Sequence, residues 1–206
     1  RNENWKEWNF NGVPVLVPEG FNTIPEPDGS LLMYPEGDQS APASGHMPHG
    51  GYYFDTIVRQ PPINEDHLDP EDNLQEFGPI SEADLAHFTR EYQRLTAASD
   101  RSAGSERAIL ANFGGTAFGD IALVPVPWVK QPRGIRDIAE WYMSTKSRRD
   151  YVWKVFERQC EIGIQNLEKI AAVVGDRIAA VFITGTDFGT QAGPFIHPKA
   201  YRDLYQ

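Results

Sequence analysis

Residues 175–206 read GDRIAAVFITGTDFGTQAGPFIHPKAYRDLYQ. The apolar run at 178–184 predicts a buried strand, and a loop of glycines, threonines and one aspartate, Asp187, follows it directly. Pro198 suits the first turn of a helix, where its missing backbone N–H does no harm, so a helix is expected from there. A strand, a glycine-rich loop and a helix in this order are typical of one βα unit.

A second unit of this kind precedes the first. The run RAILANF at 107–113 predicts another buried strand, and the glycine-rich GGTAFGD follows it. Helices are expected at about 134–145 and 148–174. This alternation predicts parallel strands joined by helical crossovers. We therefore expect an α/β fold that is part of a (β/α)8 TIM barrel, because a complete barrel typically needs about 250 residues. An open doubly wound sheet is the alternative.

The helix expected at 148–174 has an apolar face. Its members recur every three or four residues and are expected to be buried: Val152, Val155, Phe156, Cys160, Ile164, Leu167, Ala171 and Val174. Cys160 is the single cysteine of the chain, so it is expected to be a core residue and cannot form an intramolecular disulfide.

The chain divides into three parts of one domain. Residues 1–60 are rich in proline and glycine, and their short extended runs predict a small antiparallel β meander inserted on the barrel, with Asp28-Gly29 as a turn. Residues 61–106 predict an acidic connector and a helix that Ser81 caps. Residues 107–206 hold the βα units. Because the chain starts without methionine and stops within a helical pattern, we expect a fragment, incomplete at both ends.

Composition excludes several classes of function. The 206 residues carry a formal net charge of −10, which argues against binding to nucleic acid or to anionic membranes. No apolar run approaches the roughly 20 residues of a membrane span, and no signal peptide is visible, so a cytoplasmic protein is expected.

The candidate site follows from the parallel strands. Ligands bind beyond the carboxyl ends of such strands, which selects the segments 112–120 and 184–197. Each contains one aspartate, Asp120 or Asp187, and a carboxylate there could orient a substrate, accept a proton or stabilise a cation. Thr186 and Gln191 surround Asp187 as substrate-binding candidates. The alternative is that Asp187 only caps a turn.

Other chemistry-bearing residues lie elsewhere. Tyr52 and Tyr53 should face opposite ways on a strand, one into the core and one toward a substrate pocket. His46 and His49 could ligate a metal, although two solvated loop histidines are the favoured interpretation. A basic cluster, expected to be a salt-bridged surface or an anion site, consists of Arg133, Arg136, Arg148 and Arg149.

Residues 175–205 resemble the strand, loop and helix of the uroporphyrinogen decarboxylase superfamily, in the branch typified by D-x-G-T-Q-x-G-x-x-x-x-P. The upstream VLVPEGFNT, LLMYPEGD and SGHMPHGGYYFD resemble the β insertion of its methyltransferase-like and decarboxylase-like members. The resemblance implies a (β/α)8 barrel, a site at the carboxyl ends of the strands, a longer protein and a homodimer. It does not distinguish among the reactions of the superfamily.

The leading hypothesis is an enzyme that transfers a small or corrinoid-borne methyl group, with Asp187 as the catalytic residue. Transfer to a thiol would need zinc to hold the thiolate, with ligands outside this sequence, so no cofactor is expected within the chain. The second is cofactor-free decarboxylation of uroporphyrinogen, a tetrapyrrole of haem biosynthesis. True decarboxylases carry a tyrosine after the strand at 107–113, and GGTAFGDIALV has none. The third is a non-catalytic relative that binds a corrinoid or another ligand.

Overall fold

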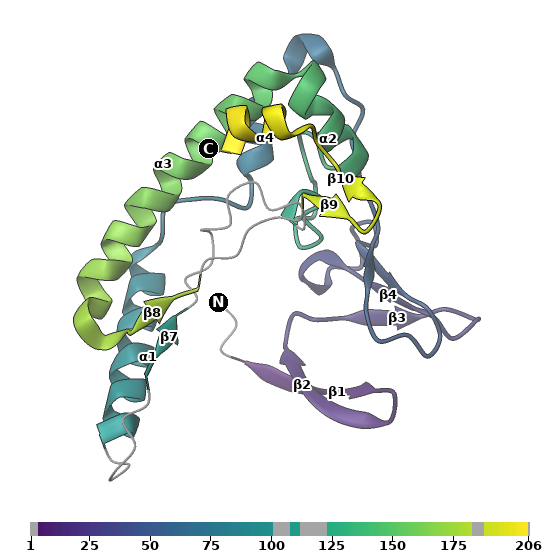
Figure 1. The fold of residues 1–206 in the computed structure, drawn as a ribbon. Coiled ribbons are helices and arrows are strands. Elements are labelled where there is room, and N and C mark those ends of the chain that lie inside the picture. Colours follow the sequence, from purple (N-terminus) through teal and green to yellow (C-terminus); the bar gives the residue numbers. More distant parts are fainter. Residues whose placement is uncertain (1–3, 101–107, 112–122, 183–187, 206) are drawn as a thin grey trace. The chain divides into compact units, whose positions relative to one another are not determined.

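The computed structural model of the chain describes residues 4–100, 108–111, 123–182 and 188–205 (Figure 1). These residues belong to two compact units, each assembled from two separate stretches of sequence. Unit 1 comprises residues 1–76 and 121–151, and unit 2 comprises residues 77–120 and 152–206.

Unit 1 contains two small antiparallel sheets. Its first hairpin pairs β1 (Trp5–Phe10) with β2 (Val13–Pro18), and Asn11 and Gly12 make the turn with positive φ angles, which this residue pair adopts easily. The second sheet has the order β3 (Thr23–Pro25), β4 (Leu31–Met33), β5 (Gly45–Met47) and β6 (Asp55–Thr56). All neighbouring strands in it are antiparallel. The strands of the first 60 residues are antiparallel as predicted, but they form two separate sheets in place of one meander, with β1, β3 and β5 as additional strands.

Short helices complete unit 1. The 3₁₀ helices are η1 (Pro35–Gly37), η2 (Glu65–His67) and η3 (Pro70–Leu74), and the α-helix is α2 (Ile138–Ser147). The carboxylate of Asp137 accepts a hydrogen bond from the backbone N–H of Glu140 at 2.8 Å, so α2 begins later than its predicted start at about 134.

A buried asparagine fastens the segment before α2 to η3. The side-chain amide of Asn73 donates to the carbonyl of Ile135 at 2.7 Å. The N–H of Ile135 in turn donates to Oδ1 of Asn73 at 2.8 Å. The hydroxyl of Tyr151 donates to Oδ1 at 2.6 Å. These bonds satisfy the polar groups of a side chain that is almost fully buried, and they bring Gly134 against Asn73.

Gly134→Ala is expected to lower the free energy of unfolding by about 2–4 kcal/mol, because it adds both a clash and backbone strain. Gly134 has a φ of +79°, and a Cβ at this position would collide with Oδ1 of Asn73. Urea-induced unfolding measures the loss. Gly175→Ala is the matched control, since Gly175 also has a positive φ but open space around it, and should cost only about 1–2 kcal/mol. Equal losses in the two variants would contradict the clash.

Unit 2 has helices against a parallel strand pair. Its elements are α1 (Glu82–Asp100), β7 (Leu110–Ala111), most of α3 (Arg149–Val174), the 3₁₀ helix η5 (Gly175–Arg177), β8 (Ala180–Val181), the hairpin of β9 (Gly189–Thr190) and β10 (Gly193–Pro194), and α4 (Pro198–Tyr205). The predicted helix start at Pro198 is confirmed, and Ser81 caps α1 by accepting the N–H of Asp84 at 3.1 Å.

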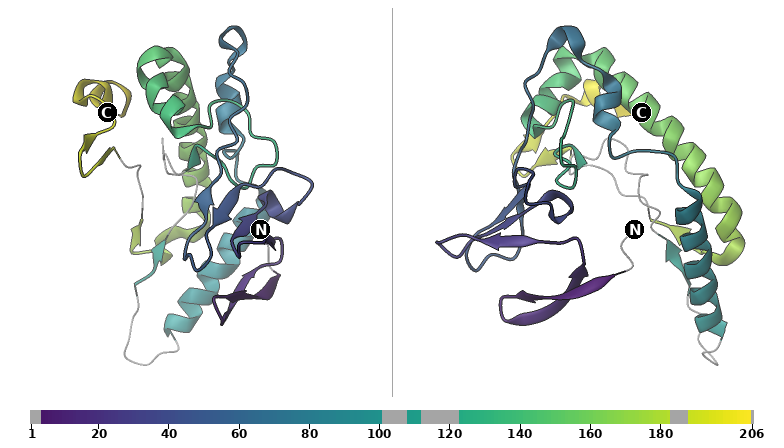
Figure 2. Two further views of the ribbon diagram at one scale, coloured as in Figure 1. Left: turned by 90° about the vertical axis from the view of Figure 1, so that its right-hand side faces the viewer. Right: turned by 180° about the vertical axis from the view of Figure 1, so that it is seen from behind.

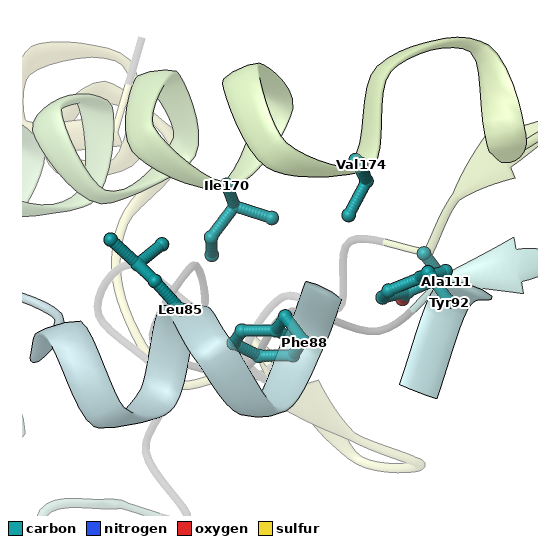
Figure 3. Close-up of a cluster of buried hydrophobic side chains, with 6 residues drawn as sticks. All are labelled: Leu85, Phe88, Tyr92, Ala111, Ile170 and Val174. Atoms are coloured by element: carbon teal, nitrogen blue, oxygen red, sulfur yellow. The ribbon is translucent and has the colours of Figure 1, made fainter. Parts of the chain in front are cut away.

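The core of unit 2 lies where α1, α3 and β7 meet (Figure 3). Its buried side chains are Leu85, Phe88 and Tyr92 from α1, Ala111 from β7, and Ile170 and Val174 from α3. Leu85, Phe88 and Tyr92 are three and four residues apart, so they share one face of α1. This cluster seats β7 against both helices.

The buried face of α3 differs from the predicted one in its second half. Gln159, Ile162 and Ile170 are buried, whereas Cys160 and Ile164 are exposed. The prediction that Cys160 is a core residue is therefore wrong. An α-helix has 3.6 residues per turn, and from Val152 that period leads close to 159, 163, 166 and 170. Successive steps of four residues, from 156 to 160 and 164, drift around the helix away from the buried face.

The expected barrel is wrong for this chain. The residues that the structure describes contain one parallel pair, β7 and β8, with two paired residues in each strand, and the remaining sheets are small and antiparallel. Among the described residues, no barrel closes and no larger doubly wound sheet forms. Strands inside a parallel barrel are buried on both faces, but Leu110 and Phe182 are exposed. Within the apolar runs at 107–113 and 178–184, the described residues contain the two-residue strands Leu110–Ala111 and Ala180–Val181.

Candidate functional site

The parallel pair places the ends of two strands side by side. Leu110 pairs with Ala180 and Ala111 with Val181, and both Figure 1 and Figure 2 show the strands next to each other. Beyond the last pair, the N–H of Phe182 donates to the carbonyl of Ala111 at 2.7 Å. The chain therefore leaves both strands at the same carboxyl edge, which is where parallel sheets bind ligands. We call this place the β7–β8 edge.

The described residues on either side of the segment 183–187, Phe182 and Phe188, have defined contacts. On one side, the backbone of Phe182 is bonded to Ala111. On the other side, the ring of Phe188 packs edge-on against Tyr201 and Tyr205 of α4, with ring centroids 4.8 and 4.7 Å apart. The N–H of Phe195 also donates to the carbonyl of Phe188 at 2.8 Å. Both flanks of the segment 183–187 thus have defined anchors.

The predicted site residues fall into two groups. Asp120, Thr186 and Asp187 lie outside the described residues. Gln191 lies between β9 and β10 with an exposed side chain, and it belongs to unit 2 like the β7–β8 edge.

Tyr52 and Tyr53 belong to unit 1, and both are exposed, to 71% and 83%. The expectation that one of them enters the core is wrong, because this stretch is not a strand and β6 starts only at Asp55. The ring of Tyr52 meets Phe10 edge-on at 6.1 Å between centroids.

Three arginines of the basic cluster form ion pairs with carboxylates of unit 1. Arg136 is fully buried, and its Nη1 lies 3.0 Å from Glu76, which is also buried. Its other donors bond to the carbonyls of Asp72 at 2.7 Å and Arg133 at 2.6 Å. Burial raises the pKa of Glu76 above its ordinary value, although the hydrogen bonds from Arg136 act in the opposite direction. This pair is internal structure.

Two further arginines of the cluster are also paired. Arg148 bonds to Glu65 and to Glu140, the latter at 3.0 Å, and the bond to Glu65 is the main cause of the raised pKa of Arg148. Arg133 lies 3.2 Å from Asp72. The interpretation as a salt-bridged surface is therefore confirmed for Arg133 and Arg148, whereas Arg136 is a buried pair.

The described residues offer no metal centre. No group of three or more His, Cys, Asp or Glu side chains among them could hold a metal ion. His46 pairs with Asp55 across β5 and β6, and the ring of His49 packs against Gly29. The zinc that thiol methylation would require finds no ligand set in this part of the chain, so no chemical step is assigned to it.

Unit 1 contains a cavity that the sequence patterns did not indicate. Its volume is about 560 Å³, and its walls include Phe21, Met33, Tyr34, Glu36, Pro127 and Trp128. We call it the Trp128 cavity. The available signal was the concentration of prolines and aromatic residues at 18–21, 34–36 and 125–128, but these segments have no strand or helix period.

Comparisons with family models, with curated proteins and with solved structures found no match to this chain. Among the described helices, none combines the length and the apolar character that crossing a membrane requires. Function is therefore inferred from the β7–β8 edge of unit 2.

Proposed function

We propose that this chain is part of a methyl-transferring enzyme of the uroporphyrinogen decarboxylase superfamily, which binds a small or corrinoid-borne methyl donor at the β7–β8 edge. The observation that carries the proposal is the bond from Phe182 to Ala111, because it joins the starts of the two loops in which Asp120 and Asp187 occur. The proposal uses this parallel pair alone and does not involve a barrel.

Asp187 is the proposed catalytic residue, and Thr186, Gln191 and Asp120 are the proposed substrate-binding residues. Asp187 directly precedes Phe188, whose ring is anchored on α4. A carboxylate beside an anchored backbone can hold a substrate in one orientation, which is a major part of enzymatic rate enhancement. Tyr52 and Tyr53 are not assigned to this edge, because they belong to unit 1.

The basic cluster belongs to unit 1, like Tyr52 and Tyr53, and gives decarboxylation at the β7–β8 edge no support. Uroporphyrinogen carries eight carboxylates, so an enzyme acting on it needs several cationic side chains that can face the substrate. Arg136 is buried on Glu76, and Arg133 and Arg148 are paired with carboxylates. Redirecting a buried arginine would leave its partner uncompensated, at a cost of several kcal/mol. A substrate with little charge avoids that cost.

Methyl transfer can be tested in the full-length protein, with zinc supplied to hold the thiolate, using methylcobalamin and a small thiol. In the expected reaction, the bond from methyl carbon to cobalt breaks with its electron pair staying on cobalt, and a bond from methyl carbon to the thiolate sulfur forms. The visible spectrum of the corrinoid reports the loss of the methyl group. Acceleration that depends on the protein supports the proposal. Release of carbon dioxide from uroporphyrinogen, or binding of the corrinoid without turnover, would instead support decarboxylation or a non-catalytic relative and overturn it.

A further inference from the structure

The Trp128 cavity has the composition of a site for an organic cation. Three aromatic residues, Phe21, Tyr34 and Trp128, contribute to its walls, together with Met33 and the acidic residue Glu36. Its volume of about 560 Å³ is in the usual range for small-molecule sites. Aromatic faces carry negative potential, and the one charged group in the lining is an acid, so the electrostatics favour a positive ligand.

Contacts within unit 1 hold the walls of the Trp128 cavity in place. The ring of Phe21 packs edge-on against Trp8 and Phe54, at centroid distances of 5.1 and 6.0 Å. The side-chain amide of Asn22 donates to the carbonyl of Gly37 at 3.1 Å, which joins the loop after β2 to η1. A preformed site loses less conformational entropy when it binds a ligand.

Unusual backbone conformations occur at this cavity. Among the non-glycine residues that the structure describes, Asn11, Glu36 and Val126 have positive φ. Asn11 is in a hairpin turn, where this is ordinary. Glu36, with φ of +51°, lines the cavity, and Val126, with φ of +34°, directly precedes Pro127 and Trp128. A β-branched residue rarely adopts such an angle, and residues held in this way cluster at ligand sites.

Val126 is kept in its conformation by long-range contacts. Its carbonyl accepts a hydrogen bond from Nη2 of Arg59 at 2.8 Å, and its N–H donates to the carbonyl of Leu123 at 3.1 Å. Its side chain is fully buried. The surrounding structure therefore imposes the angle and, with it, the position of Trp128.

Negative charge exceeds positive charge among the ionised side chains around Glu36, which favours a cation over an anion. Nζ of Lys130 lies 2.9 Å from Asp38 and 3.6 Å from Glu36, so one ammonium group faces two carboxylates. Asp38 is the nearer partner, and its pKa is lowered by hydrogen bonds from Ser40 and from Lys130. Glu36 is left with an incompletely neutralised charge, and an anionic ligand would be repelled.

We propose that the Trp128 cavity binds an organic cation that carries a methylated ammonium group. The rings of Trp128, Tyr34 and Phe21 would contact the methyl groups, and Glu36 would balance the charge. A methylated ammonium has few or no N–H donors and is weakly hydrated, so it suits aromatic walls better than a primary ammonium does. The proposal is independent of the methyl-transfer function, since all of these residues belong to unit 1.

Calorimetric titration with choline and with its neutral isostere, 3,3-dimethylbutan-1-ol, tests the proposal. The two molecules have nearly the same shape and differ in charge. Choline is expected to bind at least about ten times more tightly, because cation–π contacts and Glu36 act only on the charged ligand. Equal affinities would show an apolar pocket without selectivity for cations, and absence of choline binding would equally overturn the proposal.

Three variants locate the binding. Trp128→Leu keeps an apolar wall but removes the aromatic face, so choline should bind about ten times more weakly while the isostere is little affected. Lys130→Met removes the cation that competes for Glu36 and should tighten choline binding several-fold. Trp153→Leu, an exposed tryptophan of α3, is the control and should change nothing. Unchanged choline affinity in a folded Trp128→Leu protein would contradict the assignment.

Discussion

Asp187→Asn is expected to lower the rate of methyl transfer by about 100-fold or more, the usual contribution of a positioned acid or base. The substitution keeps the shape of the side chain and removes its charge. Asp187 precedes Phe188, which is anchored on Tyr201 and Tyr205, and lies at the end of the segment that begins beyond β8. The proposed catalytic role of Asp187 requires its charge to act on the substrate. Steady-state assays with methylcobalamin and thiol measure the loss.

The same variant separates catalysis from turn formation. If Asp187 acts on the substrate, its free energy of unfolding should change by no more than about 0.5 kcal/mol, as for most substitutions outside a core. Asp176→Asn, an exposed aspartate in η5 of the same unit, is the matched control and should leave both rate and stability unchanged. A normal rate in Asp187→Asn, together with a loss of about 1 kcal/mol of stability, would show that Asp187 only caps a turn.

Arg136→Met is expected to lower the free energy of unfolding by about 3–5 kcal/mol, because it leaves Glu76 buried without a partner. Arg136 also donates to three backbone carbonyls, of Asp72, Val124 and Arg133, and these lose their donors as well. Guanidinium-induced unfolding measures the loss. Arg133→Met is the control, since its ion pair with Asp72 is much more exposed and should contribute less than about 1 kcal/mol.

The loss in free energy of unfolding caused by Arg136→Met should also depend on pH. Without the arginine, burial raises the pKa of Glu76 further above that of an unfolded glutamate. A carboxyl with a raised pKa in the folded state binds more protons folded than unfolded, so stability falls as the pH rises above the ordinary pKa of glutamate. The variant should therefore lose more stability at pH 8 than at pH 5. Adding Glu76→Gln should abolish this difference, and a deficit independent of pH would contradict the assignment.

The local elements of this fold could be predicted from the sequence. Ser81 caps α1, Pro198 starts α4, and Asp28-Gly29 makes a turn in which the N–H of Gly29 donates to the carbonyl of Glu26 at 2.9 Å. The parallel pairing of the strands near 110 and 180 was predictable as well, from the alternation of strands and helices. Each of these features depends on residues close together in the sequence or on the order of elements.

The candidate sites were predictable only in part. The rule that parallel strands bind ligands at their carboxyl ends selected the loops with Asp120 and Asp187, and the bond from Phe182 to Ala111 agrees with the shared edge that the rule assumes. No sequence pattern indicates that Arg136 is buried on Glu76, 60 residues away, or that Phe21, Tyr34 and Trp128 line one cavity. No periodic pattern links segments so far apart.

The sequence by itself determined where α1 and α4 begin, where the turn at Asp28-Gly29 forms and which strands run parallel, because caps, prolines, glycines and apolar periods act within a few residues. The tertiary structure decided the rest. Whether a strand residue such as Leu110 is covered depends on which neighbours pack on its face, and whether an arginine is exposed or buried depends on a carboxylate brought from elsewhere in the chain. Such outcomes follow from long-range packing and desolvation, to which many segments contribute at once.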